Sequence, residues 1–142
     1  MGPLELKVGD LVVPTDLAAD VRRGGRELSP DHAARLGQLL VHAGCMEPEF
    51  FSLETIEREH GLWVSESAPF FLGAKHEAAS PGSVDPARVL IIGDGGDESP
   101  IALDYRTNPP RVVYLGGIQH VSCWFEVAKS YTELVQLLQG SD

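Results

Sequence analysis

The chain has 142 residues, 43% of them hydrophobic, which fits one globular domain with its own core. Its formal net charge is −10, and such an acidic chain repels nucleic acid, whose phosphates need clustered lysine and arginine. No stretch approaches the roughly 20 apolar residues that cross a bilayer, and the first residues lack the pattern of a secretory signal, so we expect a cytoplasmic protein.

The first 28 residues contain two short patterns. Residues 11–13 are apolar and fit one short strand. Thr15 is placed to cap a helix over residues 16–23, which Gly24 and Gly25 would end. How these elements are arranged around the core stays open.

Two capped helices follow. Ser29, with Pro30 in the first turn, predicts a helix that carries an apolar stripe of leucines and stops at Gly44. Ser52 predicts the start of another helix, which we expect to stop at Gly61 because glycine commonly ends helices. The first of these helices is interpreted as support for the core, and in the second Leu53 and Ile56 are expected to face inward.

The middle of the chain is harder to assign. Residues 62–64 and 69–72 are short apolar runs that fit either a strand or irregular core, and residues 73–86 have the composition of a surface loop. From residue 89 the pattern changes to that of strands. The continuous apolar run 89–92 predicts a central strand that is buried on both faces.

The next part of the chain predicts a meander. Residues 101–106 alternate between apolar side chains and small or polar ones, including Asp104, as in a strand with one exposed face. Two further strands are expected at residues 111–115 and 122–127, joined through a Gly-Gly connection. In the second of these, Trp124 is interpreted as a core residue.

A capped helix closes the pattern. Ser130 and Glu133 form a Ser-x-x-Glu capping box, apolar residues follow at helical spacing, and Gly140 would end the helix. The sequence therefore predicts a single α+β domain over residues 1–142, in which an antiparallel meander sheet packs against helices.

Five features of the carboxyl-terminal half recur together in one family. They are the apolar strand with its Gly/Asp turn at 91–97, the Leu-Asp strand end at 103–104, the Arg-Val-Val-Tyr strand at 111–114, the strand with Trp124, and the helix start at Ser130. In this order they resemble the SUKH superfamily, most strongly over residues 88–138. That superfamily includes fungal cell-wall-assembly regulators and many bacterial immunity proteins. The resemblance implies a non-enzymatic binding domain and supplies no catalytic residues.

The negative charge is concentrated in residues 45–104, which hold twelve acidic residues and only three basic ones. Such a surface attracts a basic protein and raises its association rate, although plain solvation of an acidic surface is the alternative. The carboxylates that we expect to steer a protein partner are Glu47, Glu49, Glu54, Glu57, Asp94, Asp97 and Glu98.

Metal and cofactor sites are not indicated. Cys45 and Cys123 form no Cys-x-x-Cys pair, so two reduced thiols are expected, and the five histidines lack ligand spacing. The acidic turn at residues 93–98 lacks the twelve-residue alternation of an EF-hand, so we interpret it as a backbone turn.

The functional hypothesis is an immunity protein that neutralises a toxin, often a nuclease, by covering it. Its partner would be a basic toxin domain, with no nucleic acid and no membrane, and the chain itself would be a monomer or weak homodimer. A regulatory adaptor related to the fungal members is the alternative. A metal-dependent nuclease built on Asp104, Glu126 and Lys129 is a third, which the acidic surface disfavours.

Overall fold

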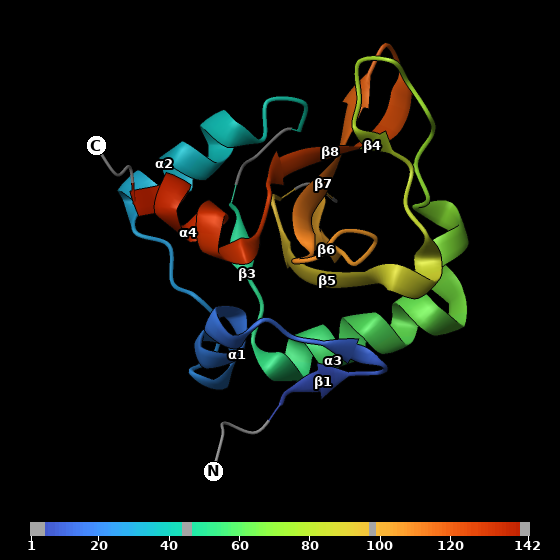
Figure 1. The fold of residues 1–142 in the computed structure, drawn as a ribbon. Coiled ribbons are helices and arrows are strands. Elements are labelled where there is room, and N and C mark those ends of the chain that lie inside the picture. The colour runs from blue at the N-terminus through green and yellow to red at the C-terminus, as the bar shows by residue number, and fades with distance from the viewer. Residues whose placement is uncertain (1–4, 44–46, 97–98, 140–142) are drawn as a thin grey trace.

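The computed structural model describes residues 5–43, 47–96 and 99–139. Within them the chain forms an α+β fold with two antiparallel sheets, which confirms the predicted fold class (Figure 1). The elements in chain order are β1 (Lys7–Val8), β2 (Leu11–Val12), α1 (Thr15–Arg22), α2 (Pro30–Leu39), β3 (Glu49–Phe50), α3 (Leu53–Leu62), a π-helix η1 (Trp63–Ser67), a 3₁₀ turn η2 (Ala68–Phe70), β4 (Pro81–Gly82), a 3₁₀ turn η3 (Pro86–Arg88), β5 (Val89–Asp94), β6 (Pro100–Asp104), β7 (Arg111–Ile118), β8 (Val121–Ala128) and α4 (Tyr131–Gln139).

The main sheet has the strand order β3-β5-β6-β7-β8-β4, and every neighbouring pair is antiparallel. Strands β5 to β8 follow one another in sequence and in space, so the predicted meander is confirmed and begins one strand earlier. Strand β4 lies inside residues 73–86, which we had expected to be loop throughout. Beside β1 and β2, the small second sheet, runs helix α3 (Figure 1).

Helices α1, α2 and α4 pack on one face of the main sheet. Leu17, Leu36 and Leu134 from these helices are buried in one cluster with Leu103 and Phe125 of the sheet. Figure 1 shows α2 and α4 lying side by side, and their residues are in contact. These three helices, with Ile56 of α3 and Val8 of β1, complete the larger of two hydrophobic cores.

The amino-terminal segment, which the sequence left unplaced, is held to α4 by a buried carboxylate. Asp20 of α1 accepts hydrogen bonds from the Tyr131 hydroxyl at 2.7 Å and from Arg26 Nε at 2.9 Å. Burial alone would raise the pKa of the Asp20 carboxyl, but the hydrogen bonds from Tyr131, Arg26 and Arg23 outweigh it and hold the pKa below 3.8. The carboxylate therefore stays charged and joins two helices that are distant in sequence.

The predicted helix stop at Gly61 is wrong. Helix α3 passes through Gly61 and continues as the π-helix and the 3₁₀ turn, so residues 62–64 are helical and not strand. An interior glycine costs a helix about 1 kcal/mol relative to alanine. Burial of the Trp63 side chain, which is only 3% exposed, offsets that cost.

The far face of the sheet is covered by this continued helix. Trp63 packs there with Ile91, Ala102 and Trp124 in a second core, and the Trp124 indole donates a hydrogen bond to the Phe71 carbonyl at 2.7 Å. The interpretation of Trp124 as a core residue is confirmed. The expected exposed face of residues 101–106 is wrong, because Ala102 and Asp104 are fully buried.

Strands β7 and β8 are longer than predicted. Two residues expected to form the turn, Gly116 and Gly117, lie inside β7, and the turn is made by Gln119 and His120 at positive φ. Gly116 is required for a different reason: a Cβ there would lie 2.6 Å from the carbonyl oxygen of His42. A glycine pair was therefore mistaken for a turn when one member serves close packing.

Three of the four predicted helix starts have the expected side-chain cap. The hydroxyls of Ser29, Ser52 and Ser130 accept from the backbone amides three residues later. Thr15 is instead the first residue of α1, and no side-chain hydrogen bond caps that helix. The capping box at α4 is also modified, because Glu133 Oε1 accepts from the amide of Lys129.

A few other expectations can be placed. Helix α2 ends at Leu39, before the predicted stop, and Cys123 is a buried free thiol, as expected. The glycines at 44 and 140 and Cys45 lie outside the described residues. None of the helices formed by residues 5–43, 47–96 and 99–139 has the length and apolar character needed to cross a bilayer.

The starts of α3 at Ser52 and of α1 at Thr15 give a matched stability test. Ser52→Ala should lower the free energy of unfolding by about 1 kcal/mol, because the amide of Thr55 loses its acceptor. Thr15→Ala should leave it unchanged or slightly raised, since Thr15 caps nothing and alanine is the better helix former. Urea denaturation measures both, and an equal loss in the two variants would contradict this assignment of the caps.

Candidate functional site

The predicted steering carboxylates among the described residues lie in or just before β3, on α3 and at the end of β5. Glu47, Glu49, Glu54 and Glu57 are all exposed, and within the described part of the chain none of them has an ion pair or side-chain hydrogen bond. Their charges are therefore available to solvent or to a partner. Asp97 and Glu98 lie outside the described residues.

The structure brings Glu49 and Asp94 together. They are register partners in the antiparallel pair of β3 and β5. Their approach depends on Gly93, because a Cβ at that position would lie 2.6 Å from the carbonyl oxygen of Glu49. Two like charges directly opposite one another are destabilising in a sheet, so this pair is not explained by stability.

Asp94 is held in one orientation by the turn that follows it. Its Oδ1 accepts from the amides of Gly96 at 2.8 Å and Ser99 at 3.2 Å, as expected for an Asp/Gly turn. Its Oδ2 has no hydrogen bond from the described residues. The turn thus fixes a carboxylate with one oxygen still able to accept.

Beside Asp94 the surface is hollowed into a pocket of about 260 Å³. One wall comes from the continued helix and the other from the sheet and the segment after η2. We call this hollow the acidic pocket; it is lined by Glu59, Leu62, Trp63, Glu66, Ser67, Phe71, Ile91, Asp94 and Pro100.

The sequence contains a signal for this pocket in the spacing of four residues. Glu59, Leu62, Trp63 and Glu66 have the spacing i, i+3, i+4, i+7, which places them on one helical face. The expected helix stop at Gly61 falls inside this set of four residues, so the sequence did not predict that they share a helical face. By the same helical period Glu54 and Glu57 lie on the other side of α3 and do not line the pocket.

The charged side chains that line the acidic pocket are all acidic. Three carboxylates and five apolar side chains line it, with no lysine or arginine. Glu59 and Glu66 have no ion pair among the described residues. Across residues 5–43, 47–96 and 99–139, no group of three potential ligands converges closely enough to hold a metal ion.

The stretch from Leu62 to Phe70 exposes large apolar side chains. Leu62 is 42% exposed, Val64 69% and Phe70 82%, so half of the large exposed hydrophobic residues in the described chain lie within nine residues. Single exposed hydrophobic residues are normal on proteins, whereas a contiguous exposed patch marks an interaction site, and these three residues are close in sequence. We call residues 62–71 the apolar segment.

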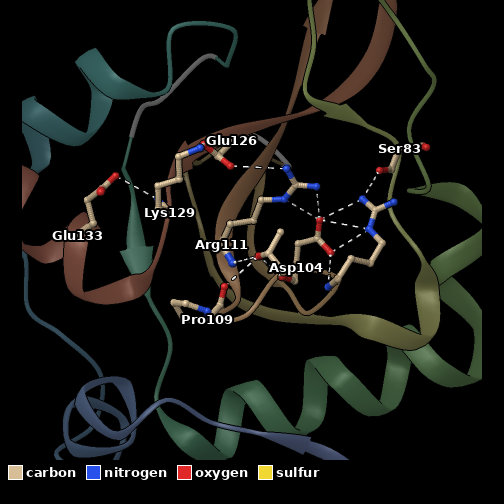
Figure 2. A network of polar contacts seen from close by, with 9 residues as sticks. Ser83, Asp104, Pro109, Arg111, Glu126, Lys129 and Glu133 are labelled. Atoms are coloured by element: carbon tan, nitrogen blue, oxygen red, sulfur yellow. Dashed lines mark hydrogen bonds and ion pairs between the residues drawn. The ribbon is translucent and has the colours of Figure 1, made fainter.

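The residues proposed for a nuclease form a different arrangement (Figure 2). Asp104 is fully buried and accepts from Arg106 Nε at 3.0 Å and from Arg111 Nε at 2.9 Å. Glu126 in turn contacts Arg111 at 3.5 Å and Lys129 at 3.1 Å. The interpretation of Asp104 as an exposed strand residue is wrong.

This network is held by charge compensation. Burial alone would raise the pKa of the Asp104 carboxyl, but hydrogen bonds from Arg106 and Arg111 outweigh burial and keep its pKa below 3.8. Arg106 also donates to the Ser83 carbonyl at 2.7 Å, which ties the loop before β5 to the network (Figure 2). Both Asp104 oxygens thus accept from arginine, an arrangement that stabilises the connection between β6 and β7 and does not resemble a metal centre.

Comparison with known proteins found no matching family model, no matching curated protein and no matching solved structure. The family resemblance of the sequence thus remains an expectation. The function has to be argued from the surface itself, whose distinctive features are the acidic pocket and the apolar segment.

Asp104→Asn should lower the free energy of unfolding by about 3 kcal/mol at neutral pH, because Arg106 and Arg111 lose their buried counter-charge. The folded-state pKa of Asp104 is depressed, so its contribution is complete above pH 3.8 and is lost as the pH falls through the folded value. The difference between the two proteins should therefore shrink in acid. Urea denaturation at neutral pH and at pH values below 3.8 measures this difference in the free energy of unfolding.

Glu126→Gln is the control for that experiment. The Glu126 side chain is 24% exposed, its Lys129 partner faces solvent, and its contact with Arg111 is the longer one at 3.5 Å, so the substitution should cost less than about 1 kcal/mol. Equal losses for Asp104→Asn and Glu126→Gln would show that burial of Asp104 does not set its contribution.

Proposed function

We propose that this chain is a non-enzymatic binding domain that neutralises a basic toxin domain by covering its working surface, as an immunity protein does. The observation that carries the proposal is the combination of uncompensated carboxylates and exposed apolar side chains along α3 and its continuation. Charged groups steer encounter, and desolvated apolar anchors supply most of the affinity.

The charge of the surface supports a cationic partner. The exposed carboxylates of Glu49, Glu54 and Glu57 and those that line the acidic pocket lie on α3 and its continuation, on β3 and at the end of β5. Arg58 is the one arginine or lysine of α3. Nuclease domains carry basic surfaces because they bind phosphates. A domain with this surface would associate with them quickly and cover the groove their substrate needs.

The family resemblance supports the same function. The features that carried it, the meander strands and the capped helix after Trp124, correspond to β5 to β8 and α4. Neutralisation by covering needs a rigid preformed surface and no turnover. The two cores and the Asp104 network supply that rigidity on either side of the sheet.

The regulatory adaptor is separated from immunity by genomic context. A gene for a large secreted toxin beside the gene for this chain favours immunity, whereas an isolated locus favours the adaptor. Activity separates the nuclease alternative: metal-dependent cleavage of DNA or RNA by the purified chain, lost in Asp104→Ala, would favour the enzyme.

The direct test uses the tagged chain to capture its partner from an extract of the source organism at low salt. We expect one basic protein, recovered in an amount close to that of the chain, whose toxicity is suppressed when both are expressed together. Recovery of only ribosomal and chaperone background, with no rescue of growth by co-expression, would contradict the proposal.

Charge removal on α3 should slow association with the captured partner. Glu54→Gln with Glu57→Gln should lower the association rate by about two- to tenfold at low salt, with little difference at high salt, because steering by exposed charges is screened. Stopped-flow mixing measures the rate.

Asp31→Asn with Glu77→Gln is the matched control for steering, because it removes the same charge from exposed positions outside α3. The rate with this variant should stay near that of the unchanged chain. An equal slowing in both double variants would mean that only net charge matters and that α3 is not the steering surface.

A further inference from the structure

We infer that the acidic pocket receives one arginine side chain of the basic partner and acts as the specificity site of the interface. The inference rests on the proposed function, because it names the chemistry that the partner must present. It follows from the size of the pocket, from the fixed positions of the side chains in its walls, and from the absence of basic residues among its lining.

The size of the pocket fits one side chain. At about 260 Å³ it lies below the range of about 300–1,000 Å³ that is typical of small-molecule sites. A single long residue that projects from a protein surface is the occupant of matching scale. Interfaces are commonly anchored by such a residue in a pocket, and arginine is enriched among these anchors.

The lining matches the two parts of an arginine side chain. Leu62, Phe71 and Ile91 offer apolar surface to the aliphatic stem. The carboxylates of Glu59, Glu66 and Asp94 can accept from the guanidinium. A purely apolar anchor would bury these carboxylates without a partner. That loss would cost more than the apolar contact returns.

The separation of the carboxylates selects a guanidinium over a metal ion. Glu59, Glu66 and Asp94 line one hollow, yet among the described residues no set of ligands converges tightly enough for a metal. A guanidinium presents five donors in a planar fork and can reach separated acceptors together. An ammonium group is a compact charge and would reach fewer of them.

The walls of the pocket are fixed before any partner arrives. The Trp63 indole donates to the Pro86 carbonyl at 2.8 Å, and the Trp124 indole holds the carbonyl of Phe71. The turn amides of Gly96 and Ser99 hold Asp94. A preformed site loses less conformational entropy on binding, which favours selectivity even for a single anchor.

The test uses the whole chain and a fragment that presents one arginine. N-acetyl-arginine methylamide is titrated into ¹⁵N-labelled protein, and N-acetyl-citrulline methylamide, its neutral isostere, is titrated in parallel. We expect shifts at the Trp63 indole N–H and at the amides of residues 91–94 with the arginine compound only. Glu59→Gln with Glu66→Gln should weaken binding by about tenfold, through loss of two charge-assisted contacts.

Asp31→Asn with Glu77→Gln, which removes the same charge elsewhere, should leave the fragment affinity unchanged. Equal shifts from the citrulline compound, no shifts at Trp63, or equal weakening in the two double variants would each overturn the inference. A captured basic partner together with no fragment binding would overturn the pocket's role and leave the proposed function standing. Fragment binding without any captured partner would support the arginine site and remove the protein-neutralising function.

Discussion

Burial of Trp63 against the far face of the sheet is the contact on which the candidate site depends. It draws helix α3 past Gly61 and turns a sheet with one covered face into a sheet covered on both. It also places Glu59 and Glu66 on the same helical face as the indole, beside Asp94. Without this contact the acidic residues of α3 would be separate surface charges, and the pocket would have no helical wall.

The elements with strong local signals could be predicted from the sequence. The serine caps at residues 29 and 52 and the apolar run of β5 depend on neighbouring residues, and local physics decides them. Gly61 and Gly116 were misinterpreted because their role is set by distant groups, Trp63 packing in one case and the His42 carbonyl in the other. A glycine alone does not show whether it ends an element or allows close approach.

The candidate site was predictable in its charge and not in its shape. The acidic segment and the turn role of Asp94 are visible in the sequence, but Glu59 and Glu66 were not singled out, because they become neighbours only when α3 continues. The burial of Asp104 was likewise not predictable from the sequence. Its alternation with Leu103 predicts exposure, but the second core covers this face of the sheet, and Arg106 and Arg111 make a buried carboxylate there tolerable.

The acidic pocket and the apolar segment share Leu62, Trp63 and Phe71, and we propose that together they bind a basic protein without turnover. Hydroxyl-radical footprinting of the chain, alone and in complex with its captured partner, tests this claim most directly. Phe70 and Val64, 82% and 69% exposed in the free chain, should become protected, while Val41, 70% exposed, and Leu137 keep their reactivity. Protection of Val41 and Leu137 with no change at Phe70 and Val64 would place the interface on the helical face of α2 and α4 and contradict the account.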